Sequence, residues 1–129
     1  MTLYLLIALG GALGSMARYW LSTLIDTQAG SAFPWGTFCV NVSGCIAIGF
    51  LATWTGPVSR HFTHETRLFF MTGICGGFTT FSAFSLQTLN LIREGDSLRA
   101  GAYVISSVVL CLAGVWLGHL LAAPFTRAS

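Results

Sequence analysis

The sequence predicts an all-α membrane protein with four membrane-spanning helices, the third of them broken in the middle of the membrane. Of the 129 residues, 54% are hydrophobic and only 8% are charged, which is too apolar for an ordinary soluble domain. Four segments are long enough to cross ~30 Å of hydrocarbon. One of them contains glycines and hydroxyl residues where a membrane helix should be most regular. The connections are short, so we expect one domain over residues 1–129 with antiparallel neighbouring spans.

The first two spans are predicted at residues 3–24 and 35–54. No positive residue precedes the apolar stretch of the first span, and Arg18 lies in its later half. We therefore interpret it as a retained helix rather than a cleaved secretory signal. Gly10 and Gly14 are four residues apart in this span, and such small residues allow helix backbones to approach closely in lipid. The second span follows Pro34, a residue that suits the entrance of a helix.

The third span, residues 65–92, is too long for a simple crossing. As one helix its 28 residues would measure ~42 Å at ~1.5 Å per residue, and either tilt or a break could absorb the excess. Glycine lets the backbone leave helical geometry, so we predict a break around Gly76-Gly77. Backbone groups freed inside a bilayer need protein, an ion or water as partners. A break at this depth indicates a binding or conduction site.

The fourth span is predicted at residues 99–123, capped by Asp96 or Ser97 and ending before Pro124. In this span Tyr103, Ser107 and Cys111 recur every four residues, which places them on one face of a helix. Such spacing is equally typical of a polar lining and of a packing seam.

Arginine counts leave the orientation in the membrane open. Each side of the membrane receives two or three arginines, so the usual bias that sets orientation is almost absent. Both a dual and a single orientation in the membrane stay possible. A chain that inserts in both orientations could form an antiparallel dimer. Four thin helices cannot enclose a wide pore, so we expect a homo-oligomer. One side is expected to carry Arg60, Arg67 and Arg127, and the other side Arg93 and Arg99. Arg18 lies in the half of the first span that is nearest this other side.

The sequence contains no catalytic constellation, so we expect no enzyme. It also contains no feature that predicts a nucleic-acid partner. The acidic residues lie at span ends or in loops, which argues against a cation or proton exchanger. Gly73-x-x-Gly76-Gly77 lacks the lysine of a phosphate loop. The four cysteines form no Cys-x-x-Cys pair and are interpreted as packing residues. The acidic residues are Asp26, Glu65, Glu94 and Asp96.

Asn41 and a row of phenylalanines are the remaining clues to chemistry. A buried asparagine in lipid needs partners for its amide, and inter-helix hydrogen bonding is one use for it. Phe78, Phe81 and Phe84 are three residues apart, as ordinary packing would also produce. Aromatic rings, however, have positive edges, which beside hydroxyl and amide donors can stabilise a small anion. The lack of a fixed positive charge suits fast passage, because conduction needs weak binding at several positions.

These segments together resemble the Fluc (CrcB-type) fluoride-channel family. The resemblance rests on residues 10–19, on 33–37 with Asn41 and Gly44, and on 73–84, in family order and spacing. It implies an antiparallel homodimer in a bacterial inner membrane, with two pathways for passive fluoride efflux that protect the cell from fluoride. It implies pore-lining rings at Phe81 and Phe84, and an amide donor to fluoride at Asn41.

The resemblance also implies a central structural sodium ion, Na⁺, held by the backbone carbonyls of Gly76 and Thr79 of both subunits. Hard cations prefer oxygen ligands. It further places four residues in the polar lining and Arg18 at a vestibule that draws in anions. Cys111 stands where a hydroxyl would suit the lining better, and no role is assigned to Gln87. The four lining residues are Tyr103, Ser107, Thr37 and Ser82.

Two other functions stay open on the sequence. A small multidrug or cation antiporter shares the four-span dual-topology architecture, but it would need a carboxylate inside the membrane. A non-transporting membrane assembly subunit would use the glycines and Asn41 for packing alone. In that case Asn41→Ala or Phe81→Ile would change oligomer stability with no transport to lose.

Overall fold

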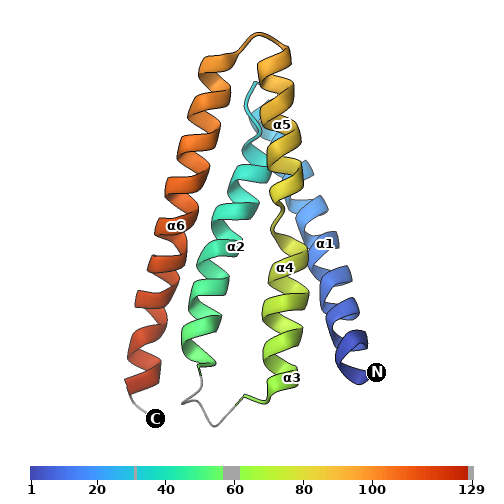
Figure 1. Ribbon diagram of the computed structural model, residues 1–129, viewed down its shortest axis with the longest axis vertical. Coiled ribbons are helices and arrows are strands. Elements are labelled where there is room, and N and C mark those ends of the chain that lie inside the picture. Colours follow the sequence, from blue (N-terminus) through green and yellow to red (C-terminus); the bar gives the residue numbers. More distant parts are fainter. Residues whose placement is uncertain (31, 57–61, 128–129) are drawn as a thin grey trace.

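The computed structural model is all-helical, and it describes residues 1–30, 32–56 and 62–127. Its long helical segments lie side by side and alternate in direction along the chain, as short connections require (Figure 1). The all-α class is therefore confirmed. The elements are α1 (Thr2–Ala29), α2 (Trp35–Trp54), α3 (His64–Arg67), the π-helix η1 (Leu68–Cys75), α4 (Gly76–Phe78), α5 (Phe81–Arg93) and α6 (Ser97–Arg127).

The observed helix bounds agree best with prediction at α2, which covers the expected 35–54. Helix α1 runs five residues past its expected end at 24, to Ala29. The prediction that the last span ends before Pro124 was wrong, since α6 continues to Arg127. Proline removes one hydrogen bond to the preceding turn, and so close to the helix end few further bonds depend on it.

Three helical segments of the described chain are long and apolar enough to cross a membrane: Trp35–Trp54, His64–Arg93 and Ser97–Thr126. Helix α1 has the length, with 28 residues, but it is less apolar, and Arg18 and Asp26 lie within it. A crossing by α1 therefore stays a prediction. Neither the dimer nor its orientation is tested by the single chain, and Arg60, one of the arginines counted for orientation, lies outside the described residues.

The third span contains a π-helix that the sequence did not predict. Residues 64–78 form one continuous helical stretch, capped by the Thr63 side chain, which accepts a hydrogen bond from the Thr66 amide at 3.3 Å. Within it, Leu68–Cys75 is wound as a π-helix. Such segments are rare and frequently occur at functional sites.

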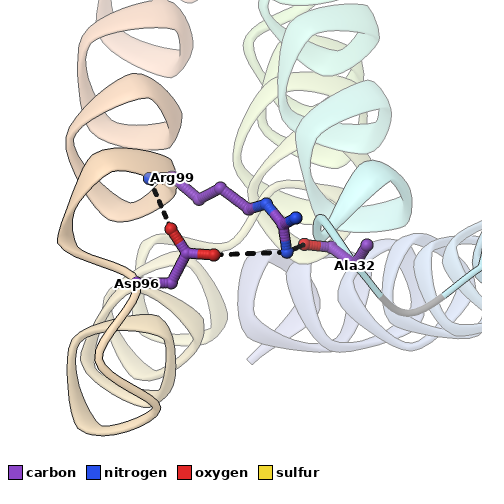
Figure 2. A network of polar contacts seen from close by, with 3 residues as sticks. All are labelled: Ala32, Asp96 and Arg99. Carbon is purple, nitrogen blue, oxygen red and sulfur yellow. Dashed lines mark hydrogen bonds and ion pairs between the residues drawn. The ribbon is translucent and has the colours of Figure 1, made fainter.

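Two glycines that follow helices have positive φ angles, Gly30 after α1 at 81° and Gly95 after α5 at 83°. Asp96 caps α6, as predicted, by accepting a hydrogen bond from the Arg99 amide at 3.1 Å. Figure 2 shows that the Arg99 guanidinium also pairs with the Asp96 carboxylate at 3.2 Å and reaches the Ala32 carbonyl at 3.4 Å. These contacts join the α5–α6 turn to the segment before α2.

Close backbone contact holds α1 against η1 and α4. A Cβ atom added to Gly10 would lie 2.9 Å from the Cα of Gly73, and one added to Gly77 would lie 2.5 Å from the carbonyl oxygen of Gly11. Real Cβ atoms do not approach other atoms this closely. The predicted close approach at Gly10 is therefore confirmed, as a contact within the chain. The most extensive helix–helix contact in the described chain is between α2 and α6.

Candidate functional site

The third span is broken at Thr79 and Thr80. Both residues are extended, with φ and ψ of −82° and 154° at Thr79 and of −149° and 116° at Thr80. The predicted break is thus confirmed, but its placement at Gly76-Gly77 was wrong by three residues. Gly76 and Gly77 are helical, and Gly77 serves close packing against Gly11 instead.

Asn41 holds the broken backbone in place from the neighbouring helix. Its Oδ1 accepts a hydrogen bond from the Thr80 amide at 2.8 Å, and its Nδ2 donates one to the Thr80 carbonyl at 3.0 Å. A single side chain therefore satisfies both polar groups of one extended residue. The inter-helix hydrogen bonding that sequence reasoning considered for Asn41 is confirmed. One hydrogen of the Asn41 amide is not used by these two bonds.

The break frees main-chain oxygens. In a continuous helix the Thr80 amide would bond to the Gly76 carbonyl, but Asn41 takes this amide. In the described part of the chain, no backbone amide donates to the Thr79 carbonyl. Unpaired carbonyl oxygens suit a hard cation such as Na⁺. The two carbonyls that the resemblance assigns to sodium thus fit that ion chemically.

Arg18 and Ser15 bind the same stretch from α1. The Arg18 guanidinium donates to the Gly77 carbonyl at 3.1 Å, and the Ser15 hydroxyl reaches this oxygen at 3.4 Å. The Arg18 side chain thus braces the helix that precedes the break. The vestibule role of Arg18 stays a prediction.

A groove with a volume of about 410 Å³ lies beside the break, between α2, α5 and α6. Five of the predicted site residues line it together: Asn41, Thr79, Phe81, Phe84 and Ser107. Its wall is mostly apolar, as small-ligand sites usually are, with a few polar groups. The remaining lining residues are Cys45, Ile48, Thr80, Val108, Cys111 and Leu112.

The two phenylalanines have different surroundings. The Phe81 side chain is 77% exposed in the single chain, whereas Phe84 is 8% exposed. Their ring centroids are 5.3 Å apart, with the planes tilted by 46°. Phe84 also packs against Tyr103, at 5.1 Å between centroids. One ring is therefore held rigidly in the core, and its neighbour stands at the edge of the groove.

Ser107 is the groove residue whose polar group lacks a partner. It is 6% exposed, and its hydroxyl oxygen is buried without a hydrogen bond from the described residues. Buried hydroxyls are normally satisfied, because leaving one unpaired costs about 1–3 kcal/mol. An unpaired hydroxyl at this position can donate to a bound molecule or ion in the groove.

Three further predicted residues are not part of the groove lining. Tyr103 is fully buried, and its hydroxyl donates to the Gln87 Oε1 at 2.9 Å. Thr37 is 5% exposed. Ser82 is exposed, with its hydroxyl 3.2 Å from that of Thr80. Their part in an ion pathway stays a prediction.

Sequence reasoning missed Thr80 and assigned Cys45 to packing. Helical spacing could have found Cys45, because it follows Asn41 by four residues and so shares its face. Thr80 gave no such signal, since its role depends on the position of the break. Among the residues that the structure describes, no group of three or more His, Cys, Asp or Glu side chains could hold a metal ion.

Comparison with known proteins identifies the family. The family model described as "CrcB-like protein, Camphor Resistance (CrcB)" matches residues 5–119. A relative from Rhodospirillum rubrum is 60% identical over 118 residues, which cover 91% of this chain and 92% of the relative. One from Opitutus terrae is 60% identical over 123 residues, with 95% and 93% covered.

A third relative, from Paramagnetospirillum magneticum, is 54% identical over 128 residues, which cover 98% of this chain and all of the relative. All three relatives are named "Fluoride-specific ion channel FluC". The similarity extends over the break, the groove and the four long helical segments. By sequence, this chain belongs to the CrcB-like family.

Proposed function

We propose that this chain is a passive fluoride channel that works as an antiparallel homodimer in the inner membrane of a bacterium, with two pathways per dimer. The groove beside the broken helix is the observation that carries this proposal. It brings two aromatic rings, an asparagine amide and an unpaired buried hydroxyl together at one place. The relatives named as fluoride-specific ion channels, at 54–60% identity, support it.

The groove offers an anion several weak contacts. Fluoride would meet the positive edges of Phe81 and Phe84, the spare hydrogen of the Asn41 amide and the Ser107 hydroxyl. None of these groups is charged, so the ion is not trapped and can leave again. Because fluoride is small and strongly hydrated, these donors must come close enough to replace its water. Thr37, Ser82 and Tyr103 would extend the polar lining, and Arg18 would draw anions towards it.

A sodium ion would sit where two protomers meet. The carbonyls of Gly76 and Thr79 from both chains would hold it, and the ion would satisfy the oxygens that the break frees. The second protomer would also cover the Phe81 side chain, which is 77% exposed in one chain. In this arrangement the cation stabilises the dimer, and it takes no part in moving fluoride.

Reconstitution tests the function directly. Liposomes that contain the purified protein should release fluoride down its gradient, and much faster than chloride. Intact, folded dimers without fluoride flux would reject the channel. Proton movement that depends on an added drug would instead support an antiporter, although the acidic side chains lie near the span ends, at Asp26, Glu65, Glu94 and Asp96.

Replacing Ser107 separates transport from folding. Ser107→Ala removes a buried hydroxyl that has no partner, so the free energy of unfolding should stay constant or rise by about 1 kcal/mol. Fluoride flux should fall roughly tenfold, since a hydrogen bond to a charged group contributes about 1.5–3 kcal/mol. Chemical unfolding and liposome efflux measure the two effects.

Ser106→Ala is the matched control, because the Ser106 hydroxyl bonds to its own helix at 2.6 Å. Undiminished flux in Ser107→Ala would remove this hydroxyl from the pathway.

Phe81→Ile tests the aromatic edge. The change removes the positive ring edge but keeps an apolar side chain, so fluoride efflux should drop while the dimer persists. Because the side chain is largely exposed within its own chain, the fold of each protomer should be preserved, and any loss of stability should appear in the association of the dimer. Leu86→Ile, at a residue 58% exposed on the same helix, should leave both quantities unchanged. Lost dimer stability without lost flux would favour the assembly subunit.

A further inference from the structure

Two cysteines lie together on the wall of the groove. Cys45 on α2 and Cys111 on α6 both line it, and both side chains are partly exposed. The remaining cysteines are elsewhere: Cys39 and Cys75 are not part of the lining, and Cys75 is 4% exposed. All four are free thiols. The pair is therefore set apart from the other cysteines by its position on the groove.

The packing of the two helices places both thiols on the same groove. Cys45 and Cys111 line it from α2 and α6, the two helices with the most extensive mutual contact in the described chain. Gly114 follows Cys111 by three residues and so shares its face of α6. A Cβ atom added to Gly114 would lie 3.5 Å from the Cβ of Cys45, which is ordinary contact. The Cys111 face of α6 is thus packed directly on the Cys45 face of α2.

We propose that Cys45 and Cys111 form a two-thiol site for a soft cation of the Hg²⁺, Ag⁺ and Cu⁺ class, and that a cation bound there obstructs the groove. Sulfur ligands select soft metal ions, and such ions accept two ligands. Binding Hg²⁺ forms two metal–sulfur bonds and releases the two thiol protons to solvent, with no change of oxidation state. With Hg²⁺ the product is neutral, and it lies on the part of the groove wall that α2 and α6 form.

The obstruction rests on the proposed function, whereas the binding does not. Ser107 precedes Cys111 by one helical turn, and Asn41 precedes Cys45 by one turn. A metal ion between the two sulfurs would thus lie next to the proposed donors to fluoride. We expect it to narrow the groove and to replace a weakly interacting wall with a bulky, fixed group.

Metal retention tests the site in purified, detergent-solubilised protein. The protein is treated with one equivalent of Hg²⁺ and washed with a free monothiol, and the retained mercury per chain is measured. Wild type should retain about one mercury ion per chain. Cys45→Ser and Cys111→Ser should each retain at least about tenfold less, because one thiolate competes poorly with free monothiol. Cys39→Ser and Cys75→Ser are the matched controls and should behave as wild type. Serine is close in size to cysteine, and gel filtration checks that each variant is folded.

The same proteins in liposomes test the obstruction. Hg²⁺ should lower fluoride efflux of the wild type at least about tenfold relative to its own untreated rate, and it should leave the rate of Cys111→Ser within about twofold of untreated. Equal mercury retention in all five proteins, or none in the wild type, would overturn the site. Retention with undiminished efflux would overturn the obstruction. If untreated protein shows no fluoride efflux, the proposed function fails, and the retention measurement still decides the site.

Discussion

Replacing Asn41 with alanine should abolish fluoride efflux and destabilise the fold at once. The change leaves both the amide and the carbonyl of Thr80 without the partners that they have at 2.8 and 3.0 Å. A buried unsatisfied group costs about 1–3 kcal/mol, and Thr80 is only partly buried, so the two losses together should lower the free energy of unfolding by roughly 2–4 kcal/mol. The variant also lacks the Asn41 side-chain amide, the proposed fluoride donor nearest to the break. Liposome efflux and chemical unfolding in detergent measure the two losses.

Asn41→Asp keeps one of the two contacts with Thr80 but removes the amide donor. A carboxylate can still accept from the Thr80 amide, but it donates nothing to the carbonyl and repels an anion in the groove. We therefore expect it to lose efflux as fully as alanine does. Ser43→Ala is the control on the same helix, since the exposed Ser43 hydroxyl bonds to the carbonyl of Cys39 at 2.7 Å. Normal efflux in Asn41→Ala would show that the break holds its shape without this side chain.

Among the glycines of α1, Gly14 is where an added methyl group, as in Gly14→Ala, should reduce stability most. A Cβ atom added there would press on the carbonyl of Ile74 and lie 2.9 Å from the amide nitrogen of Phe78. Both are backbone atoms just before the break, so they can yield only if the helix moves. Overpacking costs about 1–3 kcal/mol, occasionally more, and we expect a loss at the upper end. Because the displaced segment carries Thr79, fluoride efflux should fall too.

Gly11→Ala is a matched control one turn earlier. A Cβ atom at Gly11 would meet nothing within 4 Å. Alanine is favoured over glycine in a helix by about 0.5–1 kcal/mol, so this variant should be as stable as wild type or more stable. The contrast between two identical changes in one helix isolates the close contact with η1 and α4. Similar stability for both variants would contradict the packing of α1 on the broken span.

The sequence was sufficient for the long helices and for the existence of the break. Apolar length alone determined the second span, and the excess length of the third span with its glycines indicated an interruption. The position of the break could not be predicted, because it depends on Asn41, which reaches Thr80 from 39 residues away. The glycines misled the prediction, since Gly77 is needed for contact with Gly11 and not for freedom of the backbone.

Part of the predicted membership of the candidate site is found in one groove, and its chemistry stays a prediction. Asn41, Phe84 and Ser107 were expected together and do share the groove. Tyr103 was expected beside them because it precedes Ser107 by one turn, but its ring fills the core against Phe84. Spacing along a helix tells which side chains share a face. It does not tell which of them are covered by a neighbouring ring.

The wide winding of η1 bears on how this family can vary in length. A π-turn contains one residue more than an α-turn, so a one-residue deletion within Leu68–Cys75 can be absorbed by rewinding as an α-helix. The same deletion in α6, placed between Ser107 and Cys111, would rotate every later side chain by about 100° and move Cys111 off the face that Ser107 occupies. Evolutionary insertions and deletions should therefore concentrate in this stretch of the third span, and the groove beyond it would keep its register.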